Sequence, residues 1–277
     1  MPNYVDLHMH TTYSDGLQTP DQLLDLVRSR ELAAFAVSDH DSVGGSSEIR
    51  SLLKVGDPEL ITGVELSCSV GDSDLHMLGY LFDHESVAMD NALVSFREKR
   101  NRRARSMVDK LRSLGVDICF DDVEKYAAGG AIGRPHVAEA IYQCGAVGSY
   151  EEAFEKYIKD KGPAYVPKEN FSPEDAIALV RGCGGVTVLA HPMINENHKH
   201  IEMLANLGLD GIEIYHPSHK KRDTDWLRCE AGRFGLLVSG GSDFHGRDGR
   251  YSTVGSQKVP VDCLEKMKAL AGKRQCT

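Results

Sequence analysis

Residues 5–10 constrain the fold more than any other part of the chain, because apolar and polar side chains alternate there in the order Val-Asp-Leu-His-Met-His. An alternation with a period of two predicts a β-strand. On a strand, residues two apart project from the same face, about 7 Å from each other along the chain. The imidazoles of His8 and His10 are therefore expected side by side, either as metal ligands or as an ordinary buried pair.

The rest of the chain alternates between apolar, strand-like segments and helical segments. Further strands are expected at residues 33–37, 60–64, 75–81, 185–190, 211–215 and 236–239. Seven strands that alternate with helices predict an α/β fold with a parallel sheet and helices on its outside. In a closed barrel of this kind, the chemistry lies at the carboxyl ends of the strands.

One block interrupts this alternation. A long helix is expected from about residue 88 to 114, and shorter helices follow to about residue 157 with no strand among them. We therefore expect a barrel formed by residues 1–87 and 168–277, with a helical insertion, or cap, formed by residues 88–167.

Composition excludes several classes of protein. The chain has 277 residues and a formal net charge of −9, so extended binding to duplex DNA is not expected. No apolar run is long enough to cross a bilayer and residues 1–4 do not resemble a signal peptide, so we expect a cytoplasmic protein that does not bind membranes. Seven scattered cysteines form no Cys-x-x-Cys pair, which favours reduced thiols.

Titratable side chains gather at the expected carboxyl ends of the strands. They are His8, His10, Asp15, His40, Glu65, His76, His191, Asp243 and His245. Any one of them could be a capping or turn residue, but a random scatter of twelve histidines would not favour strand ends so heavily. Imidazole and carboxylate ligands without thiolate suit manganese, iron or zinc. Because nine ligands are too many for one ion, we expect two or three divalent metal ions that share a bridging carboxylate.

The same residues lie in short motifs that run along nearly the whole chain. In order, these are His8-x-His10, Ser14-Asp15-Gly16, Ser38-Asp39-His40-Asp41, Gly63-Val64-Glu65, the strand with His76, Ala190-His191-Pro192 and Gly241-Ser242-Asp243-x-His245. The series resembles the motifs of the PHP (polymerase and histidinol phosphatase) family. The resemblance implies a distorted (β/α)7 barrel, a site for two or three metal ions and hydrolysis of phosphate esters.

The resemblance also implies how the ligands divide among three ions. The first ion would be held by His8, His10, Glu65 and Asp243, the second by Glu65, His76 and His191, and the third by Asp15, His40 and His245. Glu65 would bridge the first two ions. Some relatives have histidine where Asp15 stands, so the metal preference of the third ion stays open.

The insertion resembles that of one PHP subgroup, which includes nucleoside 3′,5′-bisphosphate phosphatases and 5′-to-3′ RNA-trimming exonucleases. The match includes Gly133-Arg134-Pro135-His136. It implies that the substrate is a small phosphorylated molecule, either a nucleotide or a short single-stranded oligonucleotide.

A hydroxide that bridges two metal ions is the nucleophile such a site would supply, because metal binding lowers the pKa of water. Asp39 or His216 could protonate the leaving oxygen. For Asp39, the simpler interpretation as a turn residue after its strand is equally open.

Arg134 is the strongest candidate for binding a substrate phosphate away from the metals. It precedes an apolar helical segment, and a helix N-terminus with an arginine can bind an anion. The alternative is a surface arginine that caps this helix. His136, Lys161 and His219 are weaker candidates. Residues 97–112 carry eight lysines and arginines against two acids, which indicates either a solvated face or a surface that steers a polyanion.

Three functions stay open at this point. The first is a phosphatase or exonuclease that acts on nucleotides, and the second applies the same chemistry to histidinol phosphate or a sugar cyclic phosphate. The third is a catalytically silent metal-binding module. The third is disfavoured, because all nine expected ligands are present.

Overall fold

A single curved β-sheet lies at the centre of the computed structural model, which describes residues 3–71, 73–127, 129–169, 171–247, 249 and 251–275. Within these residues the sheet has eight strands in the order β7-β6-β5-β4-β3-β2-β1-β8. The strands are β1 (Tyr4–Asp6), β2 (Leu32–Val37), β3 (Glu59–Val70), β4 (Ser73–Tyr80), β5 (Val186–Leu189), β6 (Gly211–Tyr215), β7 (Leu237–Gly240) and β8 (Val259–Pro260). The sheet is a nearly closed barrel, because the Leu7 N–H donates to the Gly240 carbonyl at 3.2 Å and thereby joins the ends of β1 and β7.

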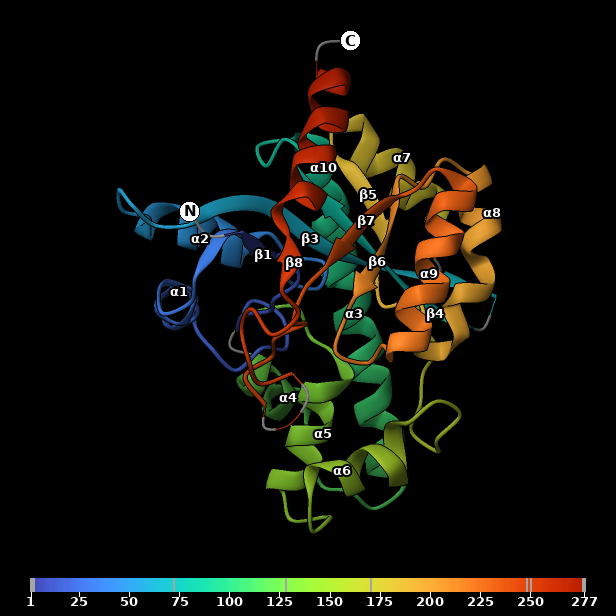
Figure 1. Cartoon of the computed structure of the whole chain (residues 1–277). Helices are drawn as coiled ribbons and strands as arrows, with labels where there is room; N and C mark the ends of the chain where they lie inside the picture. The colour runs from blue at the N-terminus through green and yellow to red at the C-terminus, as the bar shows by residue number, and fades with distance from the viewer. Residues whose placement is uncertain are drawn as a thin grey trace.

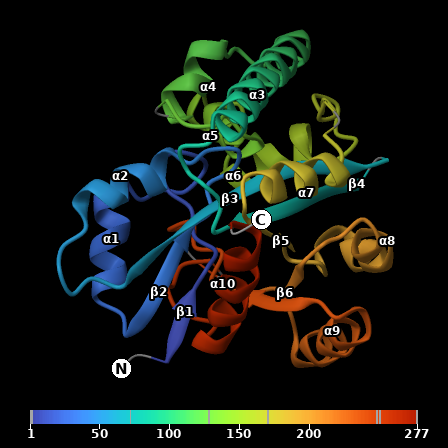
Figure 2. The ribbon, with the colours of Figure 1, turned by 90° about the horizontal axis from the view of Figure 1, so that it is seen from above.

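Helices surround this sheet and extend beyond one end of it (Figures 1 and 2). Around the sheet lie α1 (Pro20–Arg28), α2 (Gly44–Leu52), α7 (Pro173–Gly182), α8 (Ile201–Asn206), α9 (Lys221–Phe234) and α10 (Val261–Gln275). The remaining segments are α3 (Val87–Ser113), α4 (Phe120–Ala127), α5 (Arg134–Gln143), α6 (Tyr150–Ala153), a π-helical turn (Phe154–Ile158) and a 3-10 segment (Ile194–His200). The start of α7 agrees with its sequence signal, since the Ser172 hydroxyl accepts from the Asp175 N–H at 3.0 Å.

The prediction that all strands run parallel is wrong for β4, which runs antiparallel to both β3 and β5. Only residues 71 and 72 join β3 to β4, and a parallel pair needs a crossover of a dozen or more residues. β3 also continues to Val70 instead of ending at Glu65. The carboxyl half of β3 therefore lies beside the amino half of β4, so that Glu65 and His76 meet at the same end of the barrel.

Two smaller differences concern the ends of the chain. β1 stops at Asp6, so that His8 and His10 lie just after the strand, where Met9 bridges to Phe244. β8 and α10 were not predicted. α10 buries Cys263, Leu264, Met267 and Ala271, which is a helical spacing that the sequence already contains.

The helix α3 connects two separate hydrophobic clusters. Its first part contributes Met89, Leu93 and Phe96 to the core on the sheet, and its second part contributes Met107 and Leu111 to a core formed by α3 to α6 and the segments around them. Figure 1 shows α3 running from the sheet down to α4, α5 and α6. The predicted cap thus has its own core, while its boundaries at residues 88 and 167 stay a prediction. Within the described residues, none of the helices has the length and apolar character that crossing a membrane requires.

Candidate metal centre and adjoining cavity

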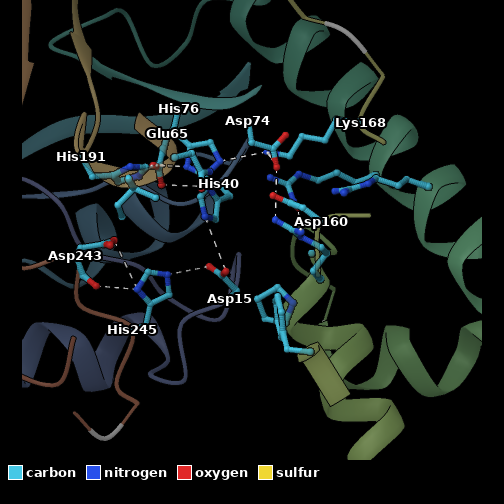
Figure 3. A pocket seen from close by; sticks show the side chains of 18 residues that line it. Asp15, His40, Glu65, Asp74, His76, Asp160, Lys168, His191, Asp243 and His245 are labelled. Atoms are coloured by element: carbon cyan, nitrogen blue, oxygen red, sulfur yellow. Dashed lines mark hydrogen bonds and ion pairs between the residues drawn. The ribbon is translucent and has the colours of Figure 1, made fainter. Parts of the chain in front are cut away.

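The structure brings all nine predicted metal ligands together at one end of the barrel, where Glu65 occupies the centre (Figure 3). The Glu65 side chain is 1% exposed and faces five imidazoles. The distances from its carboxylate oxygens to the nearest ring nitrogens of His8, His10, His40, His76 and His191 are 3.3, 3.4, 3.1, 2.9 and 3.0 Å. One oxygen faces His76 and His191 and the other faces the remaining three, which is the geometry that a bridging carboxylate needs.

Two further carboxylates complete the cluster. Asp243 Oδ1 lies 3.3 Å from His8 Nε2 and 3.2 Å from His10 Nε2. Asp15 lies between His40 and His245, with nitrogen–oxygen distances of 3.8 and 3.3 Å. Three acids therefore share one cluster with six histidines.

The backbone adopts unusual conformations at two of these residues and makes a close approach at a third position. His191 and Asp243 follow β5 and β7 with φ values of 28° and 50°, a region that non-glycine residues rarely adopt. Such strained positions collect at functional sites. Gly241 lies so close to His8 that an added Cβ would be 2.4 Å from the Cβ of His8, so only glycine lets the two strand ends approach.

The cluster keeps its carboxylates ionised. Burial alone would raise the pKa of Glu65, but the facing His40, His76 and His8 hold this pKa well below its usual value. The pKa values of Asp15 and Asp243 are likewise held low by histidines against their burial. Burial, assisted by the neighbouring His245, lowers the pKa of His10 to about 4. Against their burial, the facing carboxylates raise the pKa values of His8, His191 and His245, the last to about 9, so metal ions that bind there would displace protons.

Glu213 supports the cluster from behind and was missed by the sequence analysis. One of its carboxylate oxygens lies 3.0 Å from His8 Nδ1, and the other accepts from the His191 N–H at 2.7 Å. A carboxylate on Nδ1 fixes the ring so that Nε2 faces the cluster, as around many metal sites. The available signal was a lone acid within the apolar strand β6.

Buried atoms without partners test whether the cluster fits metal ions. His10 Nε2, His40 Nδ1 and Asp15 Oδ1 are buried without a hydrogen bond to the residues that the structure describes. These atoms face charged neighbours without making a hydrogen bond to any described residue, which is the arrangement expected where a further ligand would bind them. Potential ligand atoms form three groups, and the atoms within each group all lie within 4.8 Å of one another. The first group is His10, Asp15, His40 and His245, the second is His8, His10 and Asp243, and the third is His40, Glu65 and His76. The cluster therefore fits several metal ions, and the division of ligands among individual ions stays a prediction.

A cavity of about 350 Å³ opens onto this cluster, and its opposite wall is cationic. That wall contains Arg100, Arg103, Arg134 and Lys168, together with Asp74 and Asp160. Figure 3 shows Asp74, Asp160 and Lys168 on the side of the cavity opposite Asp243. The predicted residue Arg134 begins α5, and its guanidinium lies 2.5 Å from Asp160 Oδ1 and 3.5 Å from Asp74 Oδ2.

Two other cations of this wall were not singled out from the sequence. Lys168 Nζ lies 3.5 Å from Asp74 Oδ2 and 3.2 Å from His76 Nε2. Arg103 Nη2 is buried without a hydrogen bond to any described residue. Burial and the nearby Arg134 lower the pKa of Arg103 to about 10, so it remains a cation at neutral pH. An unpartnered guanidinium nitrogen beside a cavity indicates an anionic ligand.

The basic run of α3 fits neither interpretation of its sequence completely. Arg102 forms an exposed ion pair with Glu169, while Arg100 reaches inward to Asp41 at 2.6 Å and Lys110 to the Tyr165 carbonyl. Arg100 and Arg102 therefore join the cap to the barrel, whereas Lys110 makes its contact within the cap. Arg100 and Arg103 also line the cavity.

The other predicted candidates lie away from the lining of this cavity. His136 accepts from the Gly133 N–H at 3.0 Å at the start of α5, Lys161 is exposed, and the His219 ring lies 2.9 Å from the Ile214 carbonyl. These positions do not support phosphate binding in this cavity, so that role stays an untested prediction.

The two candidates for the leaving-group acid have different surroundings. Asp39 is fully buried and accepts from the Thr11 N–H and from the hydroxyls of Thr11 and Ser14, which favours the turn interpretation. His216 touches the cluster instead, with its Nε2 3.1 Å from Asp243 Oδ2.

Comparisons with known proteins identify the family of this chain. The chain matches the PHP domain family over residues 6–159, more than half of its length. It is 35% identical to a 3′,5′-nucleoside bisphosphate phosphatase of Chromobacterium violaceum, over 89% of both chains. It is 32% identical to a 5′-3′ exoribonuclease of Haemophilus influenzae, over 88% of this chain and 91% of the relative.

A solved structure shows the same fold. The crystal structure of a Bifidobacterium adolescentis protein assigned as a metal-dependent phosphoesterase superposes with a TM-score of 0.87 at 31% identity, over 96% of both chains. The chain therefore belongs to the PHP family and is a hydrolase of phosphate esters.

Proposed function

We propose that the protein hydrolyses nucleotides that carry two phosphates, either nucleoside 3′,5′-bisphosphates or 5′-phosphorylated oligonucleotides. The observation that carries this proposal is the pair of opposed walls in one cavity, with a histidine–carboxylate cluster on the barrel side and Arg103, Arg134 and Lys168 on the cap side. A substrate with a single phosphate would leave one of the walls without a partner.

Each wall has a separate task in this proposal. Divalent ions held by the nine ligands would neutralise the phosphoryl oxygens and make hydroxide available from water near neutral pH. The proposed metals are manganese, iron or zinc. Arg103, Arg134 and Lys168 hold the second phosphate by charge-assisted hydrogen bonds. Asp74 and Asp160 keep Arg134 in position between turnovers.

The leaving oxygen needs a proton, and we assign its delivery to His216. The ring is buried and fixed between Ser218 Oγ at 2.7 Å from Nδ1 and Asp243 Oδ2 at 3.1 Å from Nε2. A positioned imidazole next to the cluster can act as a general acid. Asp39 is a weaker choice, because the hydrogen bonds of its carboxylate go to Thr11 and Ser14, whereas His216 contacts the predicted ligand Asp243.

The names of the relatives support a nucleotide as the substrate, and one of them indicates a second class of substrate. The names of the C. violaceum and H. influenzae relatives state activities on a nucleoside bisphosphate and on RNA. A phosphoribosyl 1,2-cyclic phosphate 1,2-diphosphodiesterase of Eggerthella lenta is 30% identical over 92% of this chain and 99% of its own. A sugar cyclic phosphate is therefore the alternative substrate, and histidinol phosphate remains a further one.

A comparison of substrates tests this proposal. We would measure kcat/KM with manganese for adenosine 3′,5′-bisphosphate, a phosphoribosyl cyclic phosphate and histidinol phosphate. The bisphosphate is expected to be the best substrate. A hundredfold preference for either of the others, which is about 2.7 kcal/mol in transition-state stabilisation, would replace the proposal by the alternative.

A further inference from the structure

A second cavity, of about 320 Å³, lies against the metal cluster on the side of Asp15. Asp15 lines both cavities, so the second begins where the cluster ends. The other lining residues are Gly16, Leu17, Tyr126, His136, Glu139 and Arg247. Its volume falls within the range of small-molecule sites, roughly 300–1,000 Å³. The proposed function as described so far has no use for this space.

Two rings, those of Tyr126 and His136, and the guanidinium of Arg247 line this cavity. Tyr126 and His136 come from α4 and α5, and the Arg247 guanidinium lies 4.6 Å from the ring centroid of Tyr150. Arg247 forms no ion pair or hydrogen bond with the part of the chain that the structure describes. Glu139 accepts from Gln143 at 2.8 Å. Aromatic rings and an arginine are what proteins use to bind the bases and phosphates of single strands.

Close contacts join the barrel loop that precedes Asp15 to the cap segment that follows α4. The Ala131 N–H donates to the Tyr13 carbonyl at 2.9 Å. An added Cβ on Gly130 would lie 2.5 Å from the Thr12 carbonyl oxygen, so the two loops touch closely. The cavity's lining residues Asp15 and Tyr126 therefore come from two segments that are held together.

We infer that this cavity seats the nucleoside that follows the scissile phosphate when the substrate is a 5′-phosphorylated oligonucleotide. The inference rests on the proposed function, in which the 5′-phosphate lies against Arg103, Arg134 and Lys168 and the next phosphate lies at the cluster. The continuing chain must then leave the cluster on another side. Asp15 marks that side, because it alone lines both cavities.

The chemistry is the same for both kinds of substrate. The oxygen of water forms a bond to phosphorus, the P–O3′ bond breaks, and O3′ takes up a proton. With an oligonucleotide, the products are a nucleoside 5′-phosphate and a shortened chain that keeps the phosphate at its new 5′ end. With a bisphosphate, the products are a nucleoside 5′-phosphate and inorganic phosphate, and the second cavity is not used.

Two variants of opposite kind test the inference. Arg247→Ala removes the free cation, and Leu17→Trp fills the mouth of the cavity, where Leu17 is 50% exposed. The substrates are 5′-phosphorylated diadenylate and adenosine 3′,5′-bisphosphate, both with manganese. The matched control is Arg112→Ala, because Arg112 is an exposed arginine of α3 that lines neither cavity. Circular dichroism and melting curves verify the fold of each variant.

We expect both variants to lower kcat/KM on the dinucleotide about tenfold or more, as the loss of a stacked base does. Their activity on the bisphosphate and both activities of Arg112→Ala should be unchanged. The inference is overturned if both variants affect the two substrates equally, if neither variant has an effect, or if the wild type cleaves the bisphosphate but not the dinucleotide. This last result leaves the proposed function standing, whereas failure on both substrates removes the proposed function as well.

Discussion

The two walls of the main cavity differ in chemistry and in how they are held. The barrel wall is made of histidines and carboxylates that contact one another in a buried cluster, with Glu65 only 1% exposed. The opposite wall, called the cap wall, is formed by Arg100, Arg103, Arg134 and Lys168. The Arg134 side chain is 21% exposed and forms ion pairs with Asp74 and Asp160. A buried cluster of potential metal ligands suits bond breaking, which every substrate needs, and a separate cationic wall suits recognition of one substrate class. The following predictions test this division, beginning with the largest effect.

The largest effect is expected at the barrel wall. His191→Ala removes a ring whose Nε2 lies 3.0 Å from Glu65, so kcat should fall at least about a thousandfold on every substrate, or about 4 kcal/mol. Elemental analysis of the purified variant should show less bound metal. His84→Ala, a histidine outside the cluster, serves as the control. If the variant lost activity on some substrates only, the barrel wall would not perform the chemistry that all substrates share.

The next effect concerns the junction between the walls. Arg100 on α3 donates to Asp41 at 2.6 Å, and the two side chains are 13% and 2% exposed. Removing one partner of a buried pair costs about 3–5 kcal/mol, so Arg100→Ala should lower the melting temperature by roughly 10 °C. Arg102→Ala, which loses only an exposed pair with Glu169, should change it little. Equal melting temperatures for the two variants would show that Arg100 does not join the cap to the barrel.

Metal removal should produce a somewhat smaller effect. Ions that bind only the folded state stabilise it by about 2.7 kcal/mol at a concentration one hundred times the dissociation constant. A chelator-treated protein should therefore melt roughly 5–10 °C lower than the metal-loaded one, and differential scanning calorimetry can measure this. An unchanged melting curve for protein verified to be free of metal would contradict a shared buried centre.

The smallest effect is expected at Asp74, whose carboxylate lies beside Arg134 and Lys168. Burial alone would raise the pKa of Asp74, but Lys168, His76 and Arg134 lower it. The stability that ionised Asp74 contributes is therefore complete above the unfolded-state pKa of about 3.8 and is lost as the pH falls through the lower folded-state pKa. Asp74→Asn should lower the melting temperature slightly at pH 7, and the difference should shrink below pH 4. A constant difference across this range would assign the effect to packing.

The sequence predicted the barrel wall far better than the cap wall, for a physical reason. Predicted metal ligands such as His8 and Asp243 lie in short motifs at strand ends, and strand ends meet wherever a sheet curves into a barrel. Residues of the opposite wall, such as Arg134, Lys168 and Asp74, come from both the cap and the barrel, and only tertiary packing decides which of them face the cavity. The direction of β4 was not readable from the sequence, because the strand before it was expected to end near Glu65. The two-residue link that requires an antiparallel pair appears only because β3 continues to Val70.

The most direct test of the division compares Arg134→Ala with the wild type on two substrates. Losing a charge-assisted hydrogen bond costs about 1.5–3 kcal/mol, so KM for adenosine 3′,5′-bisphosphate should rise roughly 10- to 150-fold. KM for p-nitrophenyl phosphate, which has one phosphate, should stay near the wild-type value, and Arg134→Lys should restore part of the loss on the bisphosphate. If Arg134→Ala weakens both substrates alike, or neither, Arg134 only caps α5 and the cap wall does not read a second phosphate.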